Sequence, residues 1–478
     1  MTRHPALIWF RDDLRLSDNP ALLAAVASGR PLAAVFVLDE EAPGLRPMGG
    51  AARWWLAGAL RALAAQLGQH GLDLMLRRGP ATRIVPHVAA ELGAELVVFN
   101  DRAGAAEAKV DAAVVARLRQ EERQVERFCG HLLHAPGTIL SGAGRLPRTF
   151  SAFHRAALRL PPPGAPLPPP GHLTPASPLD NDPLEAWELE PSHPDWAGGL
   201  CKAWRPGERA AQARLATFVA DGLKGYGEGR DIPALDHVSR LSPHLRFGEV
   251  SPRQILAAVT HAEAAGGVPE TDAAKFLAEL YWREFSHHLL AATPDLARRN
   301  IQPAFDAFPW RDCPGELKAW QAGATGYPLV DAGLRELWQT GWMHNRVRMV
   351  VASFLVKHLL IDWREGEAWF WDTLVDADPA SNPASWQWVA GTGLDAAPYF
   401  RIFNPVLQGE KFDPDGAYVR RFVPELARLP ARVIHKPWTA DAATLRAAGV
   451  TLGTIYPHPI VDHAAARERA LRALKSTH

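Results

Sequence analysis

The chain has 478 residues, of which 47% are hydrophobic and 22% charged, as is typical of soluble globular proteins with two or three domains at this length. Its 52 basic and 52 acidic residues give a formal net charge of zero, so any nucleic-acid site must be a local basic patch. Three scattered cysteines exclude a disulfide framework, and neither a secretion signal nor an apolar run of membrane-spanning length is present. We therefore expect a cytoplasmic protein without a membrane partner.

Short apolar runs alternate with helical patterns in the first part of the chain. The runs at 6–10, 32–38, 72–77 and 96–100 predict buried parallel strands, with a fifth strand at 125–128. The patterns at 21–29, 51–68, 83–93 and 107–121 predict helices between them. Repeated βα units favour a doubly wound α/β domain. Since the first strand is not followed by a G-x-G-x-x-G motif or a P-loop, ordinary dinucleotide or nucleoside triphosphate binding there is unsupported.

A proline-rich stretch at 161–170 separates this part from the rest, because it can form neither a helix nor a central strand. The surrounding segment should wrap the surface with its three tryptophans, Trp187, Trp196 and Trp204, packed against something. Helical patterns follow at 212–221, 252–261, 272–288, 328–339, 345–360 and 366–374. We predict an α/β domain over 1–134, a linker over 135–205 and an all-α domain over 206–478.

Tryptophans are concentrated in the predicted helical domain, where ten of the 17 lie between Trp282 and Trp388. A helical core does not need this density, because Leu and Ala fill space without an indole N–H to satisfy. The last indoles, Trp386 and Trp388, follow an acidic, amide-rich loop at 376–383. Polar groups placed among indoles indicate a ring system held by hydrogen bonds, so a cofactor and a base are the expected ligands.

Glu279, Trp282 and Arg283 occupy positions i, i+3 and i+4 and share one helix face. A carboxylate, an indole and a guanidinium on one face can accept from a base edge, stack on the base and pair with a phosphate. The alternative for these residues alone is an exposed Glu–Arg pair beside a half-buried indole.

Asn345 and Met349 lie one turn apart on a second helix, while Arg348 points elsewhere. An amide can recognise a pyrimidine edge and a methionine can adapt to it. The alternative is a helix start with Asn near the cap and Met in the core.

Asp376 and Asp378 can pair with Arg348 or accept hydrogen bonds from a cofactor. A metal site would need further ligands at suitable spacing, so no metal is expected. Ser239, Arg240 and Ser242 offer donors suited to a phosphate or diphosphate, and a plain serine helix cap ahead of Pro243 is the alternative. The pair His287-His288 is expected on a helix surface.

Taken together, these segments resemble the photolyase/cryptochrome family, and within it the cyclobutane-pyrimidine-dimer (CPD) DNA photolyases. The matching motifs cover nearly the whole chain. They are found at 8–15, 325–328, 341–346, 386–388 and 399–405. The resemblance implies an α/β antenna domain, a long linker and a helical domain that holds a U-shaped FAD. It also implies the activity of a deoxyribodipyrimidine photo-lyase, a carbon–carbon lyase.

The resemblance implies FAD contacts at two places. Contacts on the phosphate side fall on Tyr226, Val238, Ser239, Arg240, Leu241 and Ser242. Val238 stands where the family commonly has Thr, which would remove one hydroxyl contact. Contacts around the isoalloxazine fall on Arg348, Asp376, Ala377, Asp378 and Asn382, with Asn382 beside N5 as in repair enzymes. Plant cryptochromes usually have Asp at that position.

Catalytic and DNA residues are implied in the same way. Trp386, Trp363 and Trp310 match the family's electron-transfer chain, and Glu279 and Asn382 match its catalytic residues. Lesion and DNA contacts fall on Glu279, Trp282, Arg283, Asn345, Arg346, Met349 and Trp388. Photolyases for (6-4) photoproducts have histidines where this chain has Asn345 and Met349, so the cyclobutane dimer is the expected substrate.

The implied mechanism is repair of ultraviolet-damaged DNA by a monomer. Blue light would excite reduced FADH⁻, which gives one electron to a flipped-out dimer. The segment 130–134 resembles the class III branch, whose antenna is methenyltetrahydrofolate, and 8-hydroxydeazaflavin is the alternative antenna. A cryptochrome-type blue-light receptor is the alternative function.

Overall fold

The computed structural model describes residues 4–177, 179–395, 400–475 and 477. Tyr399, which begins one of the matching motifs, lies outside these residues. Spatial contacts divide the chain into two compact units. The first unit comprises Met1–Lys224 with Ser239–Pro294, and the second comprises Gly225–Val238 with Asp295–His478. The domain limits expected from the sequence, which follow composition rather than contacts, remain a prediction.

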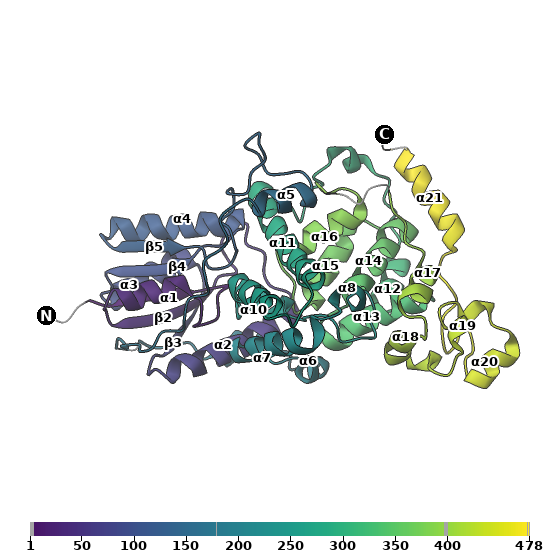
Figure 1. Cartoon of the computed structure of the whole chain (residues 1–478), viewed down its shortest axis with the longest axis horizontal. Helices are drawn as coiled ribbons and strands as arrows, with labels where there is room; N and C mark the ends of the chain where they lie inside the picture. The colour runs from purple at the N-terminus through teal and green to yellow at the C-terminus, as the bar shows by residue number, and fades with distance from the viewer. Residues whose placement is uncertain (1–3, 178, 396–399, 476, 478) are drawn as a thin grey trace. The chain divides into compact units, whose positions relative to one another are not determined.

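The first unit contains a five-stranded parallel sheet (Figure 1). Its strands are β1 (Ala6–Phe10), β2 (Leu32–Leu38), β3 (Leu74–Arg78), β4 (Leu96–Asn100) and β5 (Gln124–Phe128). The strand order is β3-β2-β1-β4-β5, so the chain reverses direction across the sheet at β1, as a doubly wound fold requires. Ile8 of β1 pairs with Ala34 on one side and Val98 on the other. The predicted fold class is confirmed.

Burial along the strands follows their place in the sheet. Every residue of β1, β2 and β4 is buried, which is why these strands have nearly continuous apolar sequences. The edge strand β5 is mostly exposed, and its Glu126 and Arg127 discourage pairing with another chain. The helices between the strands are α1 (Pro20–Ala27), α2 (Gly50–Gly68), α3 (Ala81–Glu91) and α4 (Ala105–Gln120). Helices α3 and α4 bury their apolar stripes on the face that presents Trp9, Val35 and Phe99.

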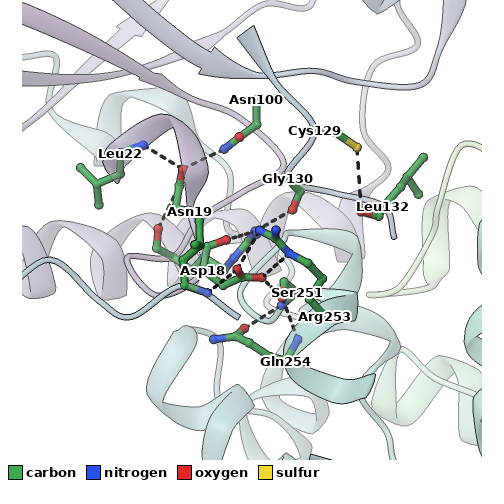
Figure 2. A network of polar contacts seen from close by, with 12 residues as sticks. Asp18, Asn19, Leu22, Asn100, Cys129, Gly130, Leu132, Ser251, Arg253 and Gln254 are labelled. Atoms are coloured by element: carbon green, nitrogen blue, oxygen red, sulfur yellow. Dashed lines mark hydrogen bonds and ion pairs between the residues drawn. The ribbon is translucent and has the colours of Figure 1, made fainter. Parts of the chain in front are cut away.

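Buried polar groups fill the carboxyl edge of this sheet, where doubly wound proteins usually bind ligands (Figure 2). Asn19 Oδ1 accepts hydrogen bonds from Leu22 N at 3.1 Å and Asn100 Nδ2 at 2.8 Å. The Asp18 carboxylate accepts from Ser251 Oγ and pairs with Arg253 at 2.7 Å. Since Ser251 also caps the helix α10 (Pro252–Ala264), this network joins the sheet to the helices that follow.

The linker segment is described throughout except for residue 178, and its prolines at 161–170 form neither helix nor strand, as predicted. It contains α5 (Phe150–Ala157), the 3₁₀ turn η1 (Leu184–Trp187) and α6 (Gly198–Ala203). Trp187 and Trp204 are buried, but Trp196 is 37% exposed. The expectation that these indoles are packed is confirmed for Trp187 and Trp204, whereas Trp196, which follows a proline-rich turn, is only partly covered.

The first unit is completed by helices α7 (Glu208–Thr217), α9 (Ser242–Arg246), α10 and α11 (Glu270–Ala292). A π-helical turn, η2 (Phe218–Gly222), extends α7. The predicted helix at 212–221 is thus an α-helix followed by a π turn. Periodicity over ten residues cannot distinguish these two hydrogen-bond patterns, because both continue the helical path.

The second unit is helical, as predicted, and is drawn from green to yellow apart from its first short segment (Figure 1). Its α-helices are α8 (Tyr226–Gly229), α12 (Pro314–Gln321), α13 (Pro328–Thr340), α14 (Asn345–Ser353), α15 (Trp363–Thr373), α16 (Ser381–Ala390), α17 (Pro405–Phe412), α18 (Ala417–Phe422), α19 (Ala431–Ile434), α20 (Ala442–Ala448) and α21 (His463–Lys475). Its 3₁₀ turns are η3 (Pro303–Ala307), η5 (Pro424–Leu426) and η6 (Pro437–Thr439).

The predicted helix at 345–360 divides into α14 and a π-helical segment, η4 (Phe354–Leu359). The core of the unit forms where α13, α14, η4, α15 and α16 meet. Among the helices that the structure describes, none combines the length and apolar character needed to cross a membrane.

Candidate functional site

The acidic, amide-rich loop lies between α15 and α16 in the second unit, and its polar side chains are buried. Asp378 Oδ1 accepts hydrogen bonds from the backbone N–H groups of Ala380 at 2.9 Å and Ser381 at 2.6 Å. These donors are at the start of α16, where a carboxylate is favoured by unsatisfied N–H groups and by the helix dipole. Asp378 therefore fixes the loop against the first turn of α16.

Asp376 forms a bidentate ion pair with Arg348 of α14, with Nη2–O distances of 2.8 and 3.1 Å. The Asp376 carboxylate is buried, and the guanidinium is also held by the carbonyl oxygen of Met343 at 2.7 Å. This pair is one of the two arrangements expected from the sequence for Asp376. Because Asp376 is buried and both of its oxygens contact Arg348, the two charges are held in one geometry, unlike those of a flexible surface pair.

Asn382 is held by a residue that the sequence analysis missed. Its Nδ2 donates to Glu367 Oε1 at 2.8 Å and to Glu367 O at 3.1 Å. Both residues are buried. Within the described part of the chain, the carbonyl oxygen Oδ1 of Asn382 has no hydrogen-bond donor. A buried amide with one end fixed and an acceptor left over is suited to a ligand that donates an N–H.

Trp386 of α16 packs edge to face among buried rings. Its centroid is 5.0 Å from that of Phe370 at an interplanar angle of 71°, and 6.3 Å from that of Trp320 at 66°. We call Trp386, Phe370 and Trp320 the Trp386 cluster. The sequence did not indicate that Phe370 and Trp320 contact Trp386.

The other two predicted electron-transfer residues belong to the same core. Trp363 is fully buried and donates from Nε1 to Asn300 Oδ1 at 2.9 Å. Trp310 is half-buried, packs against the core and contacts Phe308 at 4.4 Å between centroids. The order in which these indoles would pass an electron stays a prediction.

Other predicted residues of the second unit are held by their own chain. Arg346 pairs with Asp231 at 2.7 Å and lies 4.4 Å from the centroid of Phe412. This ion pair connects α14 to the segment that begins with Tyr226, a buried residue. Asn345 is exposed, whereas Met349, Trp388 and Val238 are half-buried and Ala377 is buried. His344, not Asn345, caps α14, since its Nδ1 accepts from Arg346 N at 3.2 Å.

In the first unit, the predicted phosphate-side residues form a tight turn. Arg240 has a φ of 50°, in the left-handed region that non-glycine residues seldom adopt. The Ser239 carbonyl oxygen accepts from Arg214 Nε at 2.8 Å, and Leu241 is buried. Ser242 is the first residue of α9, which has no side-chain cap. The alternative that Ser242 is a plain helix cap is therefore wrong.

Trp282 and Arg283 have different neighbours although they are adjacent on α11. The ring of Trp282 stacks on Phe150, with centroids 3.9 Å apart and an interplanar angle of 9°. Arg283 donates to the His131 carbonyl oxygen at 3.0 Å and contacts its ring Nε2 at 2.5 Å. Glu279, Trp282 and Arg283 are all half-buried. The alternative of an exposed Glu–Arg pair is therefore wrong, and phosphate pairing by Arg283 stays a prediction.

The histidines of α11 contradict the sequence-based expectation. His287 and His288 are 3% and 2% exposed, so the prediction of a helix surface is wrong. The neighbouring Glu284 is buried and accepts from the backbone N–H groups of Leu133 at 3.1 Å and His134 at 2.7 Å. The start of the linker therefore covers this face of α11. A contact across about 150 residues leaves no trace in the local periodicity.

Comparison with known proteins identifies the family. Residues 6–171 match the DNA photolyase family, and residues 276–476 match the FAD binding domain of DNA photolyase. The sequence is 52% identical to the deoxyribodipyrimidine photo-lyase of Agrobacterium fabrum, over 98% of this chain and 97% of that protein. The chain belongs to the photolyase/cryptochrome family.

Solved structures of the photolyase/cryptochrome family are similar over the full length. A class III photolyase from Agrobacterium tumefaciens matches with a TM-score of 0.96 and 50% identity, over 100% of this chain and 98% of that one. Cryptochromes are more distant. Cryptochrome-1 of Arabidopsis thaliana is 39% identical over 98% of this chain and 70% of that protein. The Synechocystis cryptochrome matches with a TM-score of 0.88 and 32% identity, over 99% of this chain and all of that one.

Proposed function

We propose that this protein repairs cyclobutane pyrimidine dimers in DNA under blue light, as a deoxyribodipyrimidine photo-lyase. The observation that carries the proposal is Asn382, whose amide nitrogen is fixed by Glu367 while its carbonyl oxygen has no donor among the described residues. The identity of 52% to a photo-lyase, against 39% to a plant cryptochrome, supports repair over signalling.

The second unit contains residues that fit FAD, in keeping with its family match. The free acceptor of Asn382 suits the N–H at flavin N5, and the Arg348–Asp376 pair and Asp378 provide a charged, buried wall. Tyr226, Val238 and Ala377 are the further residues of this unit proposed to hold it. For Ser239, Arg240, Leu241 and Ser242, which belong to the first unit, the contact with the phosphate side of FAD stays a prediction. When bound, reduced and excited by blue light, FAD would supply the single electron that opens the cyclobutane ring and is afterwards returned.

The residues of this chain would orient the lesion and the cofactor. Asn382 holds a hydrogen-bond acceptor at a fixed place because its amide nitrogen is tied to α15. Arg348 and Asp376 keep their charges in one geometry, so little reorganisation accompanies a change of charge nearby. Trp386, with Trp363 and Trp310, would return the cofactor to its reduced form.

The DNA-facing residues would recognise a dimer outside the helix. Photolyases are among the enzymes that flip a base out of the DNA stack. Flipping a damaged base costs less free energy than flipping an intact one. Trp282 would stack on the dimer, and Glu279 would hydrogen-bond its pyrimidine edge. Asn345, Arg346, Met349, Arg283 and Trp388 are the further proposed DNA contacts. Since Asn345 and Met349 cannot donate protons as histidines do, the cyclobutane dimer is the proposed substrate.

The antenna chromophore is proposed to be methenyltetrahydrofolate, with 8-hydroxydeazaflavin as the alternative. We also propose that the protein acts as a monomer, and that it is cytoplasmic. Absorption spectra of the chromophores extracted from purified protein distinguish the two antennas, and light scattering in solution measures the mass of the particle.

Repair is tested with irradiated DNA and purified, reduced protein. Dimers should disappear under blue light and persist in the dark. A blue-light receptor without repair activity would leave the dimer content unchanged in both conditions. Loss of dimers at the same rate in the dark would contradict the proposal in a different way, because it would indicate a light-independent enzyme.

A further inference from the structure

The linker helix α5 supplies a ring that covers one face of Trp282. Phe150, the first residue of α5, lies nearly parallel to the Trp282 indole with centroids 3.9 Å apart. His154, one turn further along α5, is nearly parallel to Phe150, at 5.4 Å and 14°. We call Trp282, Phe150 and His154 the Trp282 stack. All three residues belong to the first unit.

Local structure holds Phe150 in this place. Thr149 caps α5, because its Oγ1 accepts from Ala152 N at 3.3 Å. Phe153 is fully buried and contacts Phe285 of α11 at 5.1 Å and His288 at 5.2 Å between centroids. The docking of α5 on α11 therefore depends on Phe153. Phe150 is half-buried and, besides Trp282, lies 6.4 Å from Phe285 at an interplanar angle of 65°.

The neighbours of Trp282 leave its indole little freedom. Phe150 covers one face of the ring, and Phe285 lies 6.0 Å away at an interplanar angle of 70°. An indole that is fixed before a base arrives loses less side-chain entropy on binding than one that is mobile. A half-buried ring with one face covered can stack on a base only through the other face.

We propose that Phe150 is a positioning residue for the DNA lesion, which acts through Trp282. It holds the indole in the orientation that accepts the flipped pyrimidine dimer and reserves one ring face for it. The inference rests on the proposed function, since it requires that Trp282 stacks on the dimer. It extends the lesion site to the linker, which none of the site residues predicted from the sequence includes.

The test compares two substitutions at one position. Phe150→Leu keeps the apolar volume but removes the flat ring, whereas Phe150→Tyr keeps the ring. Leu158→Ala is the matched control, because Leu158 follows α5 and is 62% exposed. Trp282→Ala removes the proposed platform. For each variant, the Kd is measured for DNA with one cyclobutane dimer and for undamaged DNA of the same sequence. The repair rate of pre-reduced enzyme is measured at saturating DNA.

Phe150→Leu should raise the Kd for dimer DNA about three- to tenfold, the range expected for one side chain that must be ordered on binding. The Kd for undamaged DNA and the repair rate at saturation should not change. Phe150→Tyr and Leu158→Ala should bind dimer DNA like the native protein. Trp282→Ala should raise the Kd for dimer DNA about tenfold or more.

Different outcomes overturn different parts of the proposal. If Trp282→Ala weakens dimer binding but Phe150→Leu does not, the role of Phe150 is wrong and the proposed function stands. Equal losses in Phe150→Leu and Phe150→Tyr, or equal losses for damaged and undamaged DNA, also overturn it, because they indicate a structural effect. If Trp282→Ala has no effect on dimer binding, the stacking role of Trp282 fails and the inference fails with it.

Discussion

The Trp282 stack and the Trp386 cluster use the same kind of side chain in opposite ways. In the first, Phe150 lies flat against a half-buried indole at 9°. In the second, Phe370 and Trp320 meet a buried indole edge to face, at 71° and 66°. Stacked rings at a surface leave one broad face that a base can cover. Edge-to-face rings in a core leave no broad face for a ligand, which is compatible with the proposed role of Trp386 in electron transfer.

A high density of tryptophans therefore does not by itself indicate the function of each tryptophan. The angle between neighbouring rings and the exposure of the indole differ between Trp282, the proposed binding platform, and Trp386, the proposed redox group. Substitutions in and near the Trp386 cluster should have larger effects than changes at the Trp282 stack, because the residues of the cluster are more deeply buried.

The largest effect is expected for Trp386→Phe. Phenylalanine keeps an aromatic ring at this position but is far harder to oxidise than an indole. Photoreduction of oxidised FAD should fall to background, while repair by enzyme that is already reduced should stay within about twofold of native. Flavin absorbance under blue light with an external reductant measures the first quantity. If both activities fall equally, Trp386 is needed for structure and not for electron transfer.

The second effect concerns stability and arises from the buried side chain of Lys357. Lys357 of η4 is 1% exposed, and its Nζ lies 3.3 Å from the centroid of Phe400. Burial lowers the pKa of Lys357 from 10.5 to about 7. Between these values the unfolded chain binds more protons than the folded one. The penalty is therefore complete below pH 7 and is removed as the pH rises toward 10.5.

Lys357→Met should therefore stabilise the protein by on the order of 3 kcal/mol at pH 7, with a smaller gain at pH 9. Urea unfolding at the two pH values measures the difference. The exposed Lys318 provides the control, since Lys318→Met should change stability little at either pH. A gain that does not depend on pH would show that packing, not the charge, is responsible.

Gly366→Ala tests how closely the Trp386 cluster is packed. A Cβ at Gly366 of α15 would overlap the indole of Trp386 and the side chain of Leu355. We expect a loss of about 2 kcal/mol in the free energy of unfolding, as for other overpacked cores, together with reduced FAD content. Gly315→Ala is the matched control, because nothing lies within 4 Å of a Cβ there. Native stability of Gly366→Ala would contradict the described contact.

The smallest effect is expected for the pH dependence of the Trp282 stack. Burial lowers the pKa of His154 and raises the pKa of Tyr281, whose rings lie 4.9 Å apart. Both groups therefore stay neutral between pH 7 and 9. The Kd for dimer DNA at constant ionic strength should vary by less than about twofold over this range. A marked loss of affinity within it would indicate that a titrating group takes part in binding.

Much of the fold could be predicted, because its signals are local. The strands β1, β2 and β4 have the limits expected from their apolar runs. The Arg348–Asp376 pair was one of two predicted arrangements. The partners of Asn382 and Trp282 could not be predicted, because Glu367 and Phe150 lie on other helices. For the same reason, the burial of His287 was not expected.

Residue type and spacing determined the alternation of strands and helices, the polar loop before α16 and the concentration of indoles, since each depends on neighbours within a few residues. Tertiary structure alone decided which atoms of these residues already have a partner within the chain. Arg346 is committed to Asp231, and one face of Trp282 is covered by Phe150, whereas Asn382 keeps an acceptor without a donor among the described residues. The reason is physical: a hydrogen bond or a ring contact depends on distance in space, and packing brings together side chains that the chain separates.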